Sequence, residues 1–159
     1  MKEVFCRIER CLGCRSCEIA CAVEHSQAKE LTAAIKENPL PKYRVRVQWV
    51  DERGDKVRLR SMALQCRQCA EPACAEACIA GGIVKDEAEG VVRFNQEKCV
   101  GCWSCLMVCP YGAIVRVPAQ GIAVKCDHCP ERETPACVEA CLVHALVFAE
   151  PEEIEALLT

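Results

Sequence analysis

The sequence lacks any long apolar run. The longest runs, such as CLVHALVF at 141–148, are far too short to span a bilayer, so we expect no direct membrane insertion. The N-terminal stretch MKEVFCRIER lacks the apolar core and the small-residue cleavage site of a secretion signal, and it has no twin-arginine signal. We therefore expect a soluble, cytoplasmic chain in a compartment that keeps thiols reduced.

Signatures of catalytic chemistry are missing as well. The sequence contains no motif for a flavin, a nicotinamide or an activated nucleophile. The stretch AGG at 80–82 predicts a turn, because no strand–glycine–helix unit long enough for a phosphate loop surrounds it. These absences indicate a protein that is not an enzyme by itself.

Cysteine, in contrast, is present in excess, with 17 among 159 residues. Sixteen of them fall into four groups of four, every group ends in C-x3-C, and only Cys6 stands outside. The groups are Cys11, Cys14, Cys17 and Cys21; Cys66, Cys69, Cys74 and Cys78; Cys99, Cys102, Cys105 and Cys109; and Cys126, Cys129, Cys137 and Cys141. An odd number of cysteines without a secretion signal argues against a disulfide scaffold and favours bound metal.

The spacing within the groups indicates which metal centre they hold. The run C-x2-C-x2-C-x3-C-P is the signature of modules with two [4Fe–4S] clusters. Residues 99–110 match it in full, including Pro110, and the first group differs only in having Ala22 at the proline position. Three thiolates can curl around one cube, while the fourth lies a helical turn beyond and reaches the other cube. The sequence therefore predicts four [4Fe–4S] clusters with the sixteen grouped cysteines as iron ligands.

Structural zinc is the alternative, because C-x2-C pairs also build tetrahedral all-cysteine sites. A zinc ribbon needs two cysteines per knuckle, whereas each group here offers three and then one. A zinc-stabilised interaction protein is thus the rival hypothesis from another class, and a visible absorption spectrum separates the two.

The groups repeat in type along the chain. Groups one and three share C-h-G-C-x-S-C, with h apolar, as CLGCRSC and CVGCWSC. Groups two and four have a longer gap that ends in Pro-Ala-Cys, as AEPAC and ETPAC. This alternation indicates a duplicated two-cluster unit, in which the inserted prolines leave the second and fourth ligand loops slightly open.

Short strands and turns are predicted between the groups. The stretches 82–94 and 113–125 each predict two strands around a turn, and VFCRIE at 4–9 predicts one strand with Val4 and Cys6 on the same face. Residues 22–37 predict a helix that ends before Asn38 and Pro39. After it, YRVRVQWV and VRLRSMAL alternate around DERGDK and predict a hairpin. One face of its first strand is basic. We expect this face either to be exposed to solvent or to bind an acidic partner.

This pattern resembles the four-cluster ferredoxin-type electron-transfer subunits of multisubunit oxidoreductases, the family that serves dimethyl sulfoxide reductase, formate dehydrogenase and nitrate reductase. The compact length and the stretch CRSCEIACAVEHS are most similar to the small soluble members that accompany carbon monoxide dehydrogenase, tungsten-dependent aldehyde oxidoreductase or hydrogenase modules. Some large relatives have a tryptophan in place of one third-group cysteine. Here Cys102 is present and Trp103 follows it, so a fourth cube is expected.

The resemblance implies an α+β fold of two fused ferredoxin-like two-cluster modules, with short hairpins, ligand-loop helices and an inserted helix and hairpin. It implies an electron-carrier subunit that relays single electrons between a catalytic oxidoreductase subunit and an acceptor protein or flavin subunit. A free, diffusible polyferredoxin without a stable partner is the alternative within this class.

The resemblance also implies how the groups share clusters: group one pairs with group four, and group two pairs with group three. The implied ligand sets are Cys11, Cys14, Cys17 and Cys141; Cys126, Cys129, Cys137 and Cys21; Cys66, Cys69, Cys74 and Cys109; and Cys99, Cys102, Cys105 and Cys78. Sequence spacing does not decide this pairing, because groups three and four are also close enough to pair. The implied division is one module of 1–30 with 110–150, another of 60–109, an inserted region at 31–60 and a tail at 150–159.

Charge and the remaining cysteine complete the expectations. The formal net charge is −3; sixteen deprotonated thiols contribute −16 and four oxidised cores +8, so the loaded chain carries −11. We therefore expect no nucleic-acid partner. Cys6 lies in a predicted strand on an apolar face, where a free cysteine is expected to pack and not to bind iron. A row of clusters with two different ends would also allow head-to-tail self-association.

Overall fold

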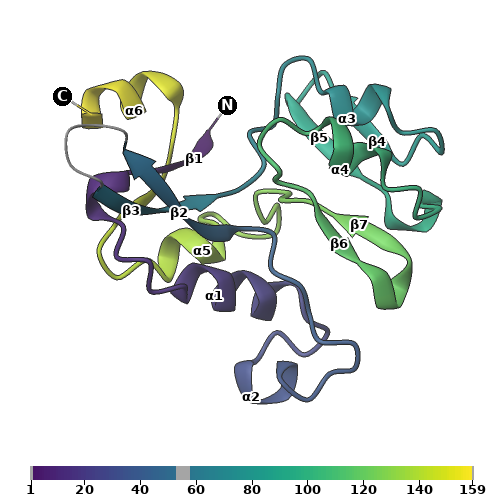
Figure 1. Cartoon of the computed structure of the whole chain (residues 1–159), viewed down its shortest axis with the longest axis horizontal. Helices are drawn as coiled ribbons and strands as arrows, with labels where there is room; N and C mark the ends of the chain where they lie inside the picture. The colour runs from purple at the N-terminus through teal and green to yellow at the C-terminus, as the bar shows by residue number, and fades with distance from the viewer. Residues whose placement is uncertain (1, 53–57, 159) are drawn as a thin grey trace.

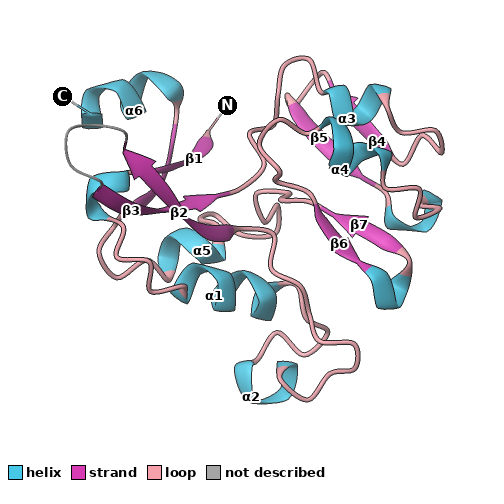
Figure 2. Cartoon of the chain, in the orientation of Figure 1, coloured by secondary structure: helices cyan, strands magenta, loops and turns pink. Residues whose placement is uncertain are grey.

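The computed structural model describes residues 2–52 and 58–158. Within them the strands form four separate two-stranded antiparallel sheets, three of which are hairpins, and the helices are short (Figures 1 and 2). This mixture of hairpins and small helices confirms the expected α+β class. Within the described residues, no helix is both long and apolar enough to cross a membrane.

One half of the molecule, the terminal half, is built from both ends of the chain (Figure 1). Its first strand pairs with its last, so that Glu3 lies opposite Ala149 and Cys6 opposite Leu146. This pairing carries α1 against α5, and the hairpin β2–β3 packs over them. The elements are β1 (Glu3–Cys6), η1 (Ile8–Arg10), α1 (Ser16–Glu24), β2 (Arg46–Glu52), β3 (Arg58–Leu64), α5 (Ala136–Glu139), β8 (Leu146–Ala149) and α6 (Pro151–Leu158).

The other half, the central half, contains the middle of the chain (Figure 1). Its helices α3 and α4 pack together beside the hairpins β4–β5 and β6–β7. The elements are α3 (Ala73–Glu76), β4 (Ile83–Asp86), β5 (Val91–Phe94), η2 (Gln96–Lys98), α4 (Ser104–Val108), β6 (Val115–Val117), η3 (Pro118–Gln120) and β7 (Ile122–Val124). The predicted strand pairs at 82–94 and 113–125 are confirmed.

The inserted region differs from its prediction. The single helix predicted over 22–37 is wrong, because α1 ends at Glu24 and a separate short helix, α2, spans Leu31–Ala34. Side chains compete with the helical backbone in between: the Ser26 hydroxyl donates to the Val23 carbonyl at 2.6 Å and accepts from the Lys29 amide at 2.9 Å. Lys29 then adopts a φ of 50°, and the Glu30 carboxylate caps α2.

The two other predicted elements of the terminal half are present with altered limits. The hairpin around DERGDK is confirmed by the β2–β3 pairing, while residues 53–57 of its turn lie outside the described residues. The strand predicted over 4–9 ends at Cys6, because η1 then turns the chain toward Cys11. The C-terminal tail is helical, as α6.

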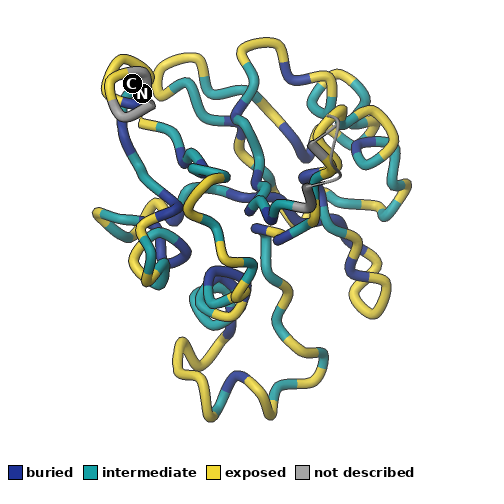
Figure 3. Tube along the Cα trace, turned by 60° about the vertical axis from the view of Figure 1, so that its left-hand side comes forward, coloured by how far each residue is buried: buried dark blue, intermediate teal, exposed yellow. Residues whose placement is uncertain are grey.

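Apolar packing in both halves is organised around cysteines. In the terminal half Val4, Val45 and Leu146 are buried together with Cys17, Cys21 and Cys137. In the central half Val92 and Ile114 are buried with Cys105. Figure 3 shows that buried residues occur in short segments along the chain, and they gather into separate clusters in the two halves. Cysteines and apolar side chains therefore form the buried clusters of both halves together.

Candidate metal centres

The ligand loops of groups one and three have the same backbone conformation. Gly13 and Gly101 both have φ of +68°, and the residue before each helix is also left-handed, with φ of 62° at Arg15 and 65° at Trp103. The helices α1 and α4 then begin at the serine of C-x-S-C. The sequence repeat C-h-G-C-x-S-C is thus a repeat of structure, in which glycine supplies the positive φ that other residues adopt at a cost.

The two loops differ after the fourth cysteine. Pro110 cannot continue a helix, and α4 ends at Val108. Ala22 stands at the equivalent place in group one, and α1 continues to Glu24. The longer helix delivers His25 to the space beside group four.

Cys11, Cys14 and Cys17 of group one line a cavity together with Cys141 of group four. The pairing of β1 with β8 brings these distant segments together. Burial, followed by the neighbouring carboxylate of Glu18, raises the pKa of Cys17 to about 12. The Sγ of Cys141 accepts the backbone amides of Ala145 at 3.2 Å and Leu146 at 3.4 Å, which stabilise negative charge on this sulfur.

Cys21 of group one lies instead among the first three thiols of group four, and all four are buried. Burial raises the pKa of Cys137, and the nearby thiols of Cys126, Cys21 and Cys129 raise it further. The Sγ of Cys21 accepts the Arg44 amide at 3.1 Å. Four crowded, buried thiols cannot ionise together unless a cation joins them, and a metal core supplies that charge.

Groups two and three are interleaved in the same way. Cys66, Cys69 and Cys74 line a cavity of about 290 Å³ together with Cys109. Burial raises the pKa of Cys74, and the neighbouring Cys66, Cys109 and Cys69 also raise it.

The last set combines Cys78 with the first three thiols of group three. Burial, then Cys78, Cys99 and Cys102, raise the pKa of Cys105 to about 11. The Sγ of Cys78 accepts the Gly82 amide at 3.2 Å. The structure thus brings together the four sets that the resemblance implies.

Each set adjoins the next, and we call this order of neighbouring sets a row. Cys17 of the first set and Cys137 of the second lie in one buried cluster. Cys66 of the third set lies close enough to Cys126 of the second to raise its pKa. Cys74 of the third set and Cys105 of the fourth pack in one cluster. All seventeen cysteines lie in the described residues, and only Cys14 and Cys102 are exposed. These two belong to the first and last sets of the row, so each end has one accessible sulfur.

Sequence reasoning missed the serines beside these two exposed thiols. The hydroxyl of Ser16 lies 3.5 Å from the Cys14 sulfur. This hydrogen bond lowers the pKa of Cys14, and Ser104 lowers the pKa of Cys102 in the same way. Their shared place in C-x-S-C is a signal that could have identified them.

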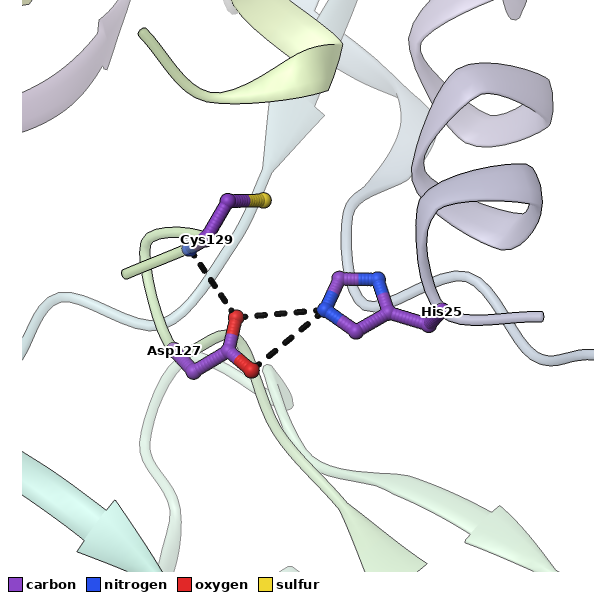
Figure 4. Close-up of side chains that lie close together, drawn as sticks. All are labelled: His25, Asp127 and Cys129. Atoms are coloured by element: carbon purple, nitrogen blue, oxygen red, sulfur yellow. Dashed lines mark hydrogen bonds and ion pairs between the residues drawn. The ribbon is translucent and has the colours of Figure 1, made fainter. Parts of the chain in front are cut away.

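A charged network also missed by sequence reasoning adjoins the buried set (Figure 4). The Nε2 of His25 lies 3.2 Å from the Asp127 carboxylate, which also pairs with Arg44 and accepts the Cys129 amide at 3.1 Å. Burial is the largest influence and acts to lower the pKa of His25, but the hydrogen bonds with Asp127 and with Cys21 together outweigh it, and the pKa rises to about 9. The Nδ1 of His25 contacts the Cys21 carbonyl at 2.7 Å.

His25, Asp127 and Cys129 present ligand atoms within 4.8 Å of one another, close enough to hold a metal ion by themselves. Two observations argue against a separate centre there. The Cys129 thiol already belongs to the buried set, and the Arg44 guanidinium already neutralises Asp127. We interpret His25 and Asp127 as the polar support of that set.

Cys6 is buried beside Cys11, and its Sγ accepts the Ala63 amide at 3.4 Å. Burial raises the pKa of Cys6 to about 11, which keeps it a neutral thiol at pH 7. Its apolar neighbours Val4, Val47 and Leu146 are consistent with the predicted packing role.

Four sets of clustered thiols define a metal-binding protein, and comparison with known proteins identifies its family. Residues 57–151 match the 4Fe-4S dicluster domain. The electron transport protein HydN of Escherichia coli K12 is 36% identical over 164 residues, covering 93% of this chain and 87% of HydN. One subunit of the anaerobic dimethyl sulfoxide reductase of Haemophilus influenzae is 36% identical over 155 residues, covering 92% of this chain and 72% of that subunit. The chain belongs to this family of 4Fe-4S dicluster proteins.

Among solved structures, the active site complex BamBC of benzoyl coenzyme A reductase in complex with zinc aligns with a TM-score of 0.44 at 23% identity. The alignment covers 99% of this chain and 87% of that one.

Proposed function

We propose that this chain is an electron-transfer subunit that relays single electrons through four [4Fe–4S] clusters, between a catalytic oxidoreductase subunit and an acceptor protein or flavin subunit. The observation that carries the proposal is the grouping of sixteen thiols into four sets of four in one row. Its relatives are named as an electron transport protein and as a subunit of a reductase. We expect the chain to have no catalytic site of its own and to work in the reducing cytoplasm.

The proposed ligands follow the four sets. Each cluster takes three thiolates from one group and the fourth from its partner group. They are Cys11, Cys14, Cys17 and Cys141; Cys21, Cys126, Cys129 and Cys137; Cys66, Cys69, Cys74 and Cys109; and Cys78, Cys99, Cys102 and Cys105. When bound, each cluster accepts and releases one electron.

The chain's own groups set the conditions for that transfer. Backbone amides donate to the sulfurs of Cys21, Cys78 and Cys141, and such hydrogen bonds stabilise added negative charge. Burial keeps water away from the second set. The amide donors act on both outer sets and on the second set, and the exposed sulfurs of Cys14 and Cys102 favour electron exchange at the two ends.

Both ends carry exposed apolar side chains around an accessible sulfur. Leu12 and Leu142, 70% and 82% exposed, follow ligands of the set that contains Cys14. Ile79 and Val100, 77% and 66% exposed, follow ligands of the set that contains Cys102. We propose that the catalytic subunit, of carbon monoxide dehydrogenase or tungsten aldehyde oxidoreductase type, docks at one end and the acceptor at the other.

Analysis of the anaerobically purified chain tests the clusters. We expect a brown protein with 16 iron atoms per chain, whereas substantial zinc without visible absorption would refute the proposal. Cys21→Ser should perturb the same spectroscopic signal as Cys126→Ser, and Cys11→Ser should share a signal with Cys141→Ser. Cys6→Ala is the matched control and should leave the iron count unchanged. If Cys21→Ser instead follows Cys11→Ser, each group holds its own cluster.

The relay itself is tested with Cys99→Ser in complex with the catalytic partner. Activity with a small dye that takes electrons directly at the catalytic subunit should survive, whereas transfer to the natural acceptor should fail. If both activities persist unchanged, the clusters are not a path for electrons. Elution of the native protein alone in gel filtration would favour the free polyferredoxin.

A further inference from the structure

Lys125 is a buried cation at the junction of the two halves of the molecule. It precedes the first cysteine of group four, and only 2% of it is exposed. Its Nζ donates to the Val92 carbonyl at 2.5 Å and to the Cys126 carbonyl at 2.9 Å, with the Gln68 Oε1 at 3.5 Å. All three acceptors are neutral, and no carboxylate lies within 4 Å of Nζ among the side chains that the structure describes.

Burying an ammonium group without a counter-charge is costly, so negative charge has to be supplied nearby. Both middle thiol sets adjoin this position. Cys126 belongs to one of them, and Gln68 precedes Cys69 of the other. The charge of Lys125 also acts on Cys74, where it lowers a pKa that burial and Cys66 raise. Four thiolates around an oxidised 2+ core leave a net charge of −2 at each set. This negative charge compensates the positive charge of Lys125, which has no other counter-charge among the described side chains.

Gln68 fixes the lysine between the two sets. Its side chain is 3% exposed and spans the junction, because Nε2 donates to the Cys126 carbonyl at 2.9 Å and Oε1 accepts the Val92 amide at 2.9 Å. The lysine and the glutamine therefore share the Cys126 carbonyl as an acceptor. This arrangement holds the charge at one place relative to both sets.

We infer that Lys125 sets the reduction potentials of both middle clusters, stabilising the electron on the clusters of Cys21, Cys126, Cys129 and Cys137 and of Cys66, Cys69, Cys74 and Cys109. The inference rests on the proposed function. Reduction adds one electron to a core, changes it from 2+ to 1+ and moves no proton, so a fixed cation nearby favours the reduced form. Electrons then reside in the middle of the row, away from the exposed sulfurs of Cys14 and Cys102.

Lys85 provides a matched comparison, because it makes similar contacts on one side only. Its Nζ donates to the carbonyls of Cys69 at 2.9 Å, Gln68 at 3.3 Å and Gly90 at 2.8 Å. These contacts lie on the group-two loop and the β4–β5 turn, with none to group four within the described residues. Lys85 should influence one middle cluster, whereas Lys125 influences two.

The experiment is a redox titration of the full, cluster-loaded chain, followed by electron paramagnetic resonance and with signals assigned through Cys126→Ser and Cys74→Ser. Lys125→Met should lower the equilibrium constant for reduction of both middle clusters at least tenfold, which corresponds to a potential lower by 59 mV for one electron. The two outer clusters should keep their potentials. Lys125→Arg, which preserves the charge, should stay close to wild type, and Lys85→Met should shift one middle cluster only.

Gln68→Glu keeps the inference falsifiable if Lys125→Met does not assemble, because it places a carboxylate against Nζ and should lower both middle potentials while the ammonium remains. Unchanged potentials in a variant with its full iron content would overturn the inference and leave the proposed function intact. Loss of clusters in both variants would assign Lys125 to assembly and also overturn it. A wild-type protein without clusters would refute the proposed function instead.

Discussion

At the scale of single residues, side chains around the thiols differ more than the thiols themselves. Ser16 and Ser104 contact the exposed sulfurs of Cys14 and Cys102. Asp127 and Arg44 form an ion pair beside the buried set. Lys125 lies near two sets at once. Because the clusters are chemically alike, these neighbours are what can distinguish their potentials.

The serines of C-x-S-C permit a direct comparison of the two ends. Ser16→Ala removes the hydroxyl that lowers the pKa of Cys14 and should lower the potential of the cluster at that end alone. Ser104→Ala should do the same at the Cys102 end. A redox titration measures both, each variant serving as the control of the other. A shift of the same signal in both variants would contradict the separation of the ends.

Asp127 supports the buried set through three contacts, with His25, Arg44 and the Cys129 amide. Asp127→Asn leaves two cationic side chains without their carboxylate and should lower the free energy of unfolding by about 1–3 kcal/mol. In a protein of this size, about 1 kcal/mol lowers the unfolding temperature by roughly 2–4 °C. Thermal unfolding followed by cluster absorption measures the change.

Asp86→Asn is the matched control, because Asp86 pairs with Arg93 at the surface, where ion pairs contribute little. An equal loss of stability in the two variants would show that the network at Asp127 has no special structural role.

At the scale of elements, the glycine of each C-h-G-C-x-S-C loop decides whether the loop can close. A Cβ built on Gly101 would lie 2.4 Å from the Gly121 carbonyl oxygen, so the third-group loop packs backbone against backbone on the β6–β7 turn. At Gly13 the nearest atom is the Cβ of Ser61, at 3.1 Å, which belongs to a side chain. Equivalent glycines of the repeat therefore leave different amounts of space for a side chain.

Alanine substitutions should follow that order. Gly81→Ala meets no atom within 4 Å and measures the cost of the left-handed conformation alone, about 1–2 kcal/mol. Gly13→Ala should cost somewhat more. Gly101→Ala should cost most, and it should also lower the iron content, because the loop that carries Cys99 and Cys102 cannot stay in place. Iron analysis and thermal unfolding of the three variants check this order, and equal losses in all three would disprove it.

At the scale of the whole molecule, the thiol sets share the buried interior with apolar side chains. Buried residues occur in short segments (Figure 3), and cysteines take part in the buried clusters of both halves. Each of the four sheets has only two strands, and isolated two-stranded hairpins are marginal in water.

Removing the iron should therefore unfold the chain. Treatment with a chelator and an oxidant under denaturant-free conditions should abolish most of the far-ultraviolet circular dichroism. Without the clusters, nothing joins the thiols of each set and the interior is no longer held together. Anaerobic reconstitution with iron and sulfide should restore it. Retention of the full native signal in the iron-free protein would show that the apolar packing suffices.

Features that depend on near neighbours in the chain could be predicted before folding was known. The four cysteine groups, the repeat of two loop types and the hairpins at 82–94 and 113–125 could be predicted, because spacing, glycine and turn residues act within a few positions. The helix predicted over 22–37 is interrupted for a local reason as well, because the Ser26 hydroxyl bonds to the Val23 carbonyl and the Lys29 amide.

Only the tertiary structure decided which thiols lie together and what surrounds them. Cys141 lies beside Cys11 because β1 pairs with β8 from the other end of the sequence, a contact that no local spacing specifies. The burial of Lys125, the contact of Asp127 with Arg44 and the exposure of Cys14 and Cys102 arise in the same way. Charge, burial and proximity depend on segments that meet only after folding, and these are the properties that distinguish one cluster site from another.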